Sequence, residues 1–86
     1  MNTSVDISYY PLHSEFIPPI KDFITRLNQH PDMKVNTNGM STQVFGKYSY
    51  VMEAITKEIE KSFELPHSVF ILKIINADLQ IHTKEL

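Results

Sequence analysis

The hydrophobic pattern of this chain switches between a period of two and a helical period, and the order of these switches restricts the fold. Residues Val5 to Tyr10 alternate between apolar and polar side chains, which is typical of a strand. From Phe16 onward, apolar residues recur three and four positions apart, which predicts an amphipathic helix. Pro18-Pro19 fits the first turn of this helix, where a missing amide costs little. His30-Pro31 ends it, because the residue before proline disfavours helical dihedral angles.

The middle of the chain predicts a hairpin followed by a second helix. Met33 to Thr37 and Ser41 to Phe45 have the pattern of short strands, and Asn38-Gly39 between them favours the positive φ angles of a tight turn. Ser14 and Ser49 are candidate N-caps of the two helices. Leu65-Pro66 ends the second helix. Its apolar stripe consists of Val51, Met52, Ile55, Ile59 and Phe63.

The last strand-like segment, Val69 to Ile75, is almost continuously apolar. Strands of this kind usually have both faces covered. One face would meet the two helices, whereas the rest of the chain is too short to cover the other. We therefore expect self-association across the open face of the sheet, as a dimer or a tetramer.

The order of the patterns is strand, helix, strand, strand, helix, strand, within a single domain of residues 1–86. This order predicts an α+β fold of the ferredoxin-like βαββαβ type. Right-handed crossovers place both helices on one face of a four-stranded antiparallel sheet, in which the strands take the spatial order 4-1-3-2. Asp78 to Leu86 alternates weakly, which fits either a frayed end or an added strand at a subunit interface.

Composition excludes several classes of function. The net charge is −2 and the basic residues form no stripe, so we expect no nucleic-acid partner. No apolar run approaches the roughly 20 residues that cross a bilayer, and the start of the chain lacks a signal-peptide pattern, so a cytoplasmic protein without a membrane partner is expected. The chain has no cysteine. The four histidines lack the spacing of a metal site, and are expected at the surface: His13, His30, His67 and His82.

Catalytic chemistry has weak support in the sequence. The hydroxyl side chains have no identifiable base and orienting partner, and no phosphate-binding glycine loop is present. The acids of the second helix alternate with lysines and are expected on a solvated face: Glu53, Glu58, Glu60 and Glu64. We therefore expect no enzymatic activity, no cofactor and no metal.

The segment from Thr37 to Gly46 is the best candidate for a binding site. It contains neutral hydrogen-bonding groups and no charge. Asn38, Ser41 and Thr42, with Gln43, supply amides and hydroxyls of the kind that suits an aminopyrimidine, although a polar edge strand would explain them as well. Tyr10 and its neighbour Tyr9 point to opposite faces of the sheet, so one packs in the core while the other could wall a pocket.

Three stretches of the sequence resemble a known family. They are Ile7 to Leu12, which ends in Tyr-Pro-Leu, the helix start at residues 16–20, and Thr37 to Gly46, which contains Met-Ser-Thr and closes with glycine. The similarity continues through Tyr50 to Ala54 and Val69 to Ile74. On these residues the chain resembles the YkoF-like thiamine/hydroxymethylpyrimidine-binding family.

The resemblance implies a ferredoxin-like domain that binds thiamine or its pyrimidine moiety without converting it. It implies a cleft between the sheet and a helix, where Asn38, Ser41 and Thr42 would meet the pyrimidine and Tyr10 or another aromatic residue would stack on it. Single-domain members assemble into dimers and tetramers. The tandem member carries an acid at the position of Asn38, so this chain would lack that attraction for a cation.

The sequence thus predicts a non-catalytic binding protein for thiamine or hydroxymethylpyrimidine, acting as a homo-oligomer in vitamin uptake, salvage or sensing. Three alternatives share the fold. They are an ACT-like regulatory module that binds amino acids, an assembly domain without a ligand, and a small ferredoxin-like enzyme that uses His13.

Overall fold

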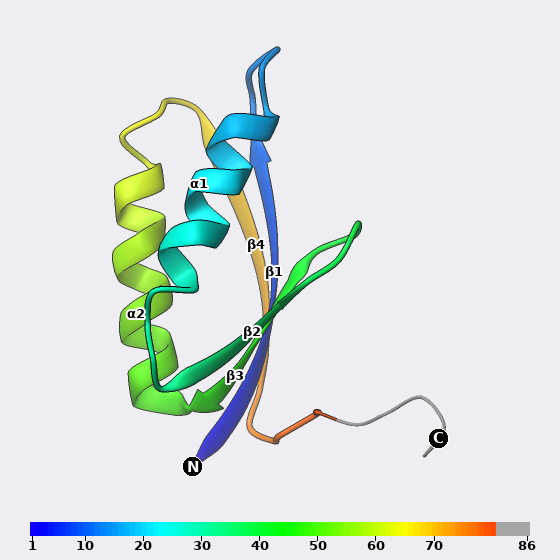
Figure 1. Ribbon diagram of the computed structural model, residues 1–86, viewed down its shortest axis with the longest axis vertical. Helices are drawn as coiled ribbons and strands as arrows, with labels where there is room; N and C mark the ends of the chain where they lie inside the picture. Colours follow the sequence, from blue (N-terminus) through cyan, green and yellow to red (C-terminus); the bar gives the residue numbers. More distant parts are fainter. Residues whose placement is uncertain (81–86) are drawn as a thin grey trace.

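The computed structural model describes residues 1–80 (Figure 1). Its elements are β1 (Asn2–Pro11), α1 (Ile17–Leu27), β2 (Met33–Thr37), β3 (Thr42–Lys47), α2 (Tyr48–Ser62) and β4 (Ser68–Ile75). All six predicted elements are present in the predicted order. Most of the weak strand pattern at the end of the chain lies outside the described residues, and Asp78 to Gln80 form no strand.

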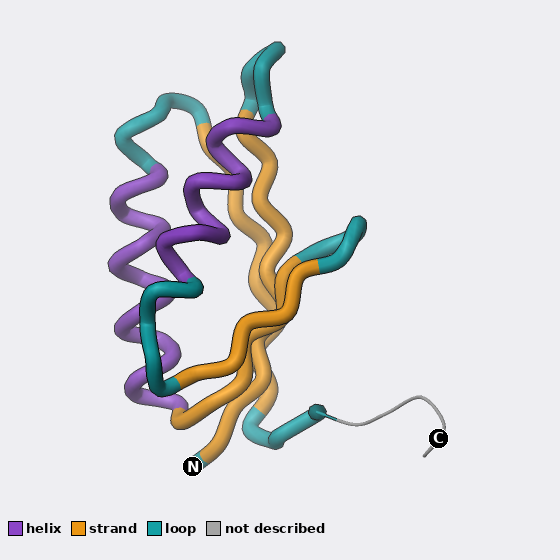
Figure 2. Tube along the Cα trace, viewed as in Figure 1, coloured by secondary structure: helices purple, strands orange, loops and turns teal. Residues whose placement is uncertain are grey.

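The four strands form one antiparallel sheet in the order β2-β3-β1-β4, which confirms the ferredoxin-like α+β fold (Figure 2). The central strand β1 pairs with β3 on one side and with β4 on the other. Val5 marks the register, because it lies opposite Val44 of β3 and Ile74 of β4. Both helices lie on the same face of the sheet (Figure 1), and the other face carries no helix.

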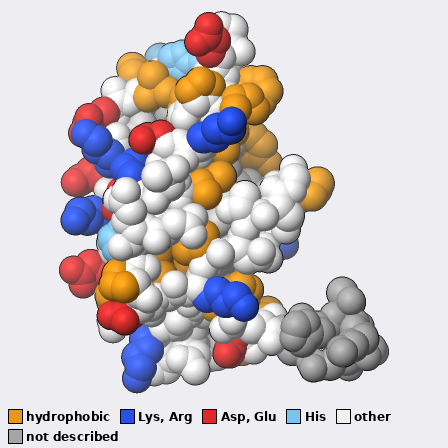
Figure 3. Space-filling view, viewed as in Figure 1, with side chains coloured by type: hydrophobic (Ala, Val, Ile, Leu, Met, Phe, Trp, Pro, Cys, Tyr) orange, Lys and Arg blue, Asp and Glu red, His pale blue; other side chains and the backbone are white. Residues whose placement is uncertain are grey.

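The core lies between the helices and one face of the sheet. Because side chains alternate along a strand, every second residue of β1 and β3 points into this layer. The fully buried apolar residues are Val5, Ile7 and Val44 from the sheet, Phe23 and Leu27 from α1, and Val51, Ala54 and Ile55 from α2. Charged side chains gather along the α2 side of the molecule, and hydrophobic ones at the end where α1 begins (Figure 3).

The helix starts differ in part from the sequence prediction. Pro18 and Pro19 lie in the first turn of α1, as expected. The N-cap positions, however, are occupied by Phe16 and Lys47, and neither makes a side-chain cap hydrogen bond. The predicted caps at Ser14 and Ser49 are therefore wrong. β3 runs directly into α2, which leaves no loop residue free to act as a cap.

The acids of α2 do not all face solvent. Glu58 is buried, and its carboxylate joins the two helices by accepting from Arg26 at 2.8 Å and from His30 at 2.7 Å. Arg26 also donates to the hydroxyl of Ser62 at 2.6 Å. The prediction that Glu58 belongs to a solvated face is therefore wrong. His30 is only partly at the surface, because its side chain is 19% exposed.

Candidate functional site

A small cleft lies between α1, the middle of β1 and the turn that joins β2 to β3. Its volume is about 130 Å³. This is close to the volume of about 150 Å³ of an apolar cavity that holds one benzene molecule, so the cleft is on the scale of a single six-membered ring. It is lined by Ile7, Tyr9, Ile20, Phe23, Ile24 and the turn segment from Thr37 to Thr42.

One wall of the cleft is aromatic. The rings of Tyr9 and Phe23 meet edge to face with their centroids 5.6 Å apart, and Phe70 of β4 packs behind Tyr9 at 4.1 Å. Phe23 is only 1% exposed, and the Tyr9 hydroxyl lies 3.3 Å from the hydroxyl of Ser68. These contacts fix the ring of Tyr9, which can therefore act as a rigid surface for a flat ligand.

The opposite wall is polar but uncharged. The hydroxyl oxygens of Thr37 and Thr42 lie 3.0 Å apart and share a hydrogen bond. None of the residues that line the cleft has a carboxylate or a basic side chain. Hydroxyl groups both donate and accept, so this wall can pair with a ring nitrogen or with an exocyclic amine.

Asn38 holds the turn beside this wall. Its side-chain oxygen accepts from the backbone N–H groups of Met40 at 2.8 Å and Ser41 at 3.1 Å. Its side-chain nitrogen donates to Gln43 at 3.2 Å. Gly39 does not have a positive φ, so the turn does not use the conformation predicted from Asn38-Gly39. The Asn38 side chain supplies the stability of the turn instead.

The hydroxyl of Ser41 turns away from the cleft, although Ser41 is one of the lining residues. It donates to Oδ1 of Asp6 at 2.6 Å, on the face of the sheet that the helices do not cover. Asp6 also accepts from Nε2 of Gln43 at 2.9 Å. The hydrogen bonds from Ser41 and Gln43 lower the pKa of Asp6 from its ordinary value of 3.8, with a smaller contribution from the charge of Lys73.

Of the four predicted ligand residues, the structure brings three to the cleft. Asn38, Ser41 and Thr42 line it, but Tyr10 does not. Tyr10 pairs with Val69 on the open face and is 51% exposed. The aromatic residue of the cleft is Tyr9. The sequence held the signal for this, because Tyr9 shares its strand parity with the buried residue Ile7.

Asp6 was missed by the sequence analysis. It lies 35 residues before Ser41, and only the pairing of β1 with β3 brings the two together. Among residues 1–80, no group of three or more metal-ligating side chains forms a metal site. Nor does that part of the chain contain a helix long and apolar enough to cross a membrane.

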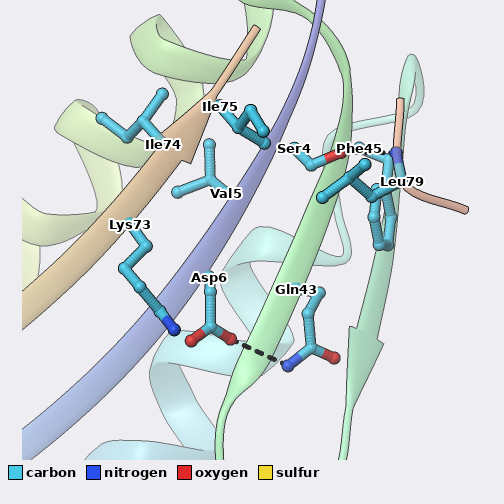
Figure 4. Close-up of a pocket in the computed structure, with 9 residues that line it drawn as sticks. All are labelled: Ser4, Val5, Asp6, Gln43, Phe45, Lys73, Ile74, Ile75 and Leu79. Carbon is cyan, nitrogen blue, oxygen red and sulfur yellow. Dashed lines mark hydrogen bonds between the residues drawn. The ribbon is translucent and has the colours of Figure 1, made fainter. Parts of the chain in front are cut away.

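A second hollow, of about 360 Å³, lies on the open face (Figure 4). Asp6 lies at the centre of one end, with Gln43 on one side and Lys73 pointing toward it from the other. The other end is apolar and includes Phe45, Ile75 and Leu79. The hydroxyl of Ser4 holds the segment after β4 against this end, because it donates to the carbonyl of Ala77 at 2.7 Å and accepts from the N–H of Leu79 at 2.9 Å.

Comparison with known proteins gives structural similarity at low sequence identity. No protein-family profile and no curated protein matches the sequence. A candidate thiamine biosynthesis/salvage protein from Thermotoga maritima superposes with a TM-score of 0.80 at 18% identity, covering 99% of this chain and 94% of that one. A hypothetical protein from Methanocaldococcus gives 0.77 at 23% identity, with coverages of 98% and 89%.

A domain of unknown function, DUF77, from Bacillus cereus gives a TM-score of 0.70 at 11% identity, covering 99% of this chain and 86% of that one. At these identities the agreement establishes a shared fold over nearly the whole chain.

Proposed function

We propose that this chain binds a small uncharged aminopyrimidine, either hydroxymethylpyrimidine or the pyrimidine part of thiamine, and does not convert it. The observation that carries the proposal is the cleft itself, which has room for one ring, an aromatic wall at Tyr9 and a neutral hydrogen-bonding wall at Thr37 and Thr42. The Thermotoga neighbour named for thiamine biosynthesis or salvage adds support from the shared fold. Such a protein would serve vitamin uptake, salvage or sensing in the cytoplasm.

The cleft favours hydroxymethylpyrimidine over thiamine. Thiamine carries a cationic thiazolium ring, and no acid lines the cleft to attract it. The volume of about 130 Å³ is also on the scale of one ring rather than of the two linked rings of thiamine. An analogue without the exocyclic amine would leave a polar group of the wall unpaired, at a cost of about 1–3 kcal/mol, which corresponds to a 5- to 150-fold loss of affinity.

Isothermal titration calorimetry with hydroxymethylpyrimidine, its deaminated analogue and thiamine tests the proposal. Thr42→Val keeps the shape of the side chain and removes its hydroxyl, so we expect at least a fivefold increase in Kd for hydroxymethylpyrimidine. Thr56→Val on the exposed surface of α2 is the matched control and should leave Kd unchanged. Equal Kd values for wild type and Thr42→Val would contradict this site. A response to amino acids alone would favour the ACT-like alternative.

We also propose that the chain assembles with copies of itself through the open face of the sheet. Four apolar side chains of β1 and β4 are exposed there: Tyr10 (51%), Val69 (41%), Ile71 (56%) and Ile75 (44%). Tyr10, Val69 and Ile71 occupy neighbouring positions of the β1–β4 ladder and form one apolar surface, whereas Ile75 lies beyond the Asp6–Lys73 pair. Patches of this kind on small proteins commonly mark interfaces between proteins.

Sedimentation equilibrium measures the assembly directly. Ile71→Lys places a charge in the middle of the exposed patch and is expected to give monomers at concentrations where the wild type is a dimer or a tetramer. Ile17→Lys on α1 changes a residue of similar exposure (48%) on the other side of the molecule, and should leave the assembly intact. If the wild type sediments as a monomer at high concentration, this part of the proposal is wrong.

A further inference from the structure

Asp6 and the turn beside the cleft are joined by a chain of hydrogen bonds. Asp6 accepts from the hydroxyl of Ser41 at 2.6 Å and from Nε2 of Gln43 at 2.9 Å. Oε1 of Gln43 accepts from the side-chain nitrogen of Asn38 at 3.2 Å. Asn38 in turn accepts from the N–H groups of Met40 and Ser41, which form the turn. These hydrogen bonds run from the open face of the sheet to the residues that close the cleft.

The carboxylate of Asp6 restricts how Ser41 and Gln43 can hydrogen-bond, and Nε2 of Gln43 also donates to the hydroxyl of Ser41 at 2.7 Å. An ionised carboxylate only accepts hydrogen bonds, so both Ser41 and Gln43 must donate to it. The amide of Gln43 then turns its NH₂ toward Asp6 and its oxygen toward Asn38. An amide at position 6 would present a donor as well as an acceptor, and could reverse the amide of Gln43. The oxygen that Asn38 needs would then be lost.

Asp6 has no part in the cleft itself. It does not line the cleft. Ile7 and Tyr9 do line it, and the side chain of Asp6 lies on the opposite face of the sheet from theirs. Its charged neighbour is Lys73 of β4, which points toward it (Figure 4), whereas the side chains from β3 that contact it are neutral. An effect of Asp6 on a ligand in the cleft would therefore be transmitted through the turn.

We propose that Asp6 is a positioning residue that holds the Asn38–Ser41 turn in its ligand-binding geometry from the opposite face of the sheet. The statement about the ligand rests on the proposed function, whereas the statement about the turn does not. If copies of the chain assemble through the open face, contacts on that face would act on the same hydrogen bonds that shape the cleft. Asp6 would then link assembly to ligand binding.

The test uses Asp6→Asn, the exchanged pair Asp6→Asn/Gln43→Glu, and the control Lys73→Gln. The exchanged pair returns a carboxylate to the network, now on β3, where it can accept from Ser41, from Asn38 and from the new amide at position 6. Lys73→Gln changes a neighbouring charge but none of these hydrogen bonds. Each variant is measured in three ways: Kd for hydroxymethylpyrimidine, amide hydrogen exchange of Met40 and Ser41 by NMR, and the oligomeric state by sedimentation.

We expect Asp6→Asn to raise Kd about 5- to 20-fold and to speed exchange at Met40 and Ser41. The exchanged pair should recover most of both effects, and Lys73→Gln should show neither. Equal Kd and equal exchange in Asp6→Asn and wild type would overturn the inference, as would a loss of affinity that the exchanged pair fails to recover.

If the wild type does not bind hydroxymethylpyrimidine, the proposed function fails and the exchange data decide the inference alone. Faster exchange at Met40 and Ser41 in Asp6→Asn, restored in the exchanged pair, would then support Asp6 as the residue that holds the turn. Unchanged exchange would overturn it.

Discussion

Replacing Glu58 with alanine removes the acceptor that joins the two helices. In the native protein its carboxylate accepts from Nη1 of Arg26 at 2.8 Å and from Nε2 of His30 at 2.7 Å. All three side chains are mostly buried, with exposures of 10% for Glu58, 15% for Arg26 and 19% for His30. The variant therefore leaves a guanidinium group and an imidazole in a largely dry place without their shared partner.

The expected cost follows from what Arg26 loses and keeps. Breaking a buried ion pair by removing one partner costs about 3–5 kcal/mol. Arg26 retains hydrogen bonds to Asp22 at 3.0 Å, to the carbonyl of Glu58 at 2.9 Å and to Ser62 at 2.6 Å, and it reaches some water. We therefore expect a loss of about 2–3 kcal/mol in the free energy of unfolding, which lowers Tm by about 10–20 °C in a domain of this size.

The loss should also depend on pH. Burial by itself would raise the pKa of Glu58, but the hydrogen bonds from His30 and Arg26 outweigh it, so the pKa lies below the ordinary value of 4.5. A carboxyl group with a lowered pKa stabilises the fold fully above its unfolded value and loses this effect as the pH falls through its folded value. The difference between wild type and Glu58→Ala should therefore be largest near pH 7 and shrink below pH 4.5.

Urea denaturation followed by circular dichroism at pH 7 and at pH 3 measures both quantities. Glu60→Ala is the matched control, because Glu60 is an exposed acid on the same helix, and its effect should stay within about 0.5 kcal/mol. Two results would refute the reasoning. One is a Glu58→Ala loss no larger than that of the control, and the other is a loss of equal size at the two pH values.

Two further predictions concern packing. A Cβ at Gly46 would lie 3.0 Å from Cγ2 of Val51, so Gly46→Ala should lower the free energy of unfolding by about 1–3 kcal/mol in urea denaturation. A Cβ at Gly39 would meet nothing within 4 Å, so Gly39→Ala should be nearly neutral. Equal effects of the two variants would contradict the close approach of β3 to α2. Ile55 is fully buried, so Ile55→Ala should lower the free energy of unfolding by about 2–5 kcal/mol, measured by thermal unfolding. Ile17 is 48% exposed, and Ile17→Ala is the control. A loss for Ile55→Ala no larger than that of the control would mean that the core is misplaced.

Much of the candidate site followed from local sequence. The neutral polar segment from Thr37 to Gly46 was found because its composition is unusual between two helices, and its first part, Thr37 to Thr42, lines the cleft. The contacts that each side chain makes did not follow from the local sequence. Asn38 and Ser41 were assigned to the ligand, but their polar atoms bind the turn and Asp6. Those bonds depend on the register of β1 against β3, which composition does not contain.

Glu58 shows how a local pattern can mislead. Lys57, Glu60 and Lys61 close to it in the sequence are charged, which suggested a solvated face. Its position on the helix, four residues after Ala54 and three after Ile55, places it on the buried stripe instead. The helical spacing alone could have raised that possibility. The acid is tolerated there only because Arg26 of α1 and His30, just after α1, reach it.

By itself the sequence determined the order and type of the six elements, because a period of two or of 3.6 is a local property that each segment carries alone. It also determined that β4 is apolar on both faces, with Phe70 and Leu72 toward the helices and Val69 and Ile71 on the open side. Only the tertiary structure decided which polar groups meet. Asp6 with Ser41, and Glu58 with Arg26, are pairs separated by more than thirty residues, and strand register and helix packing bring them within hydrogen-bonding distance.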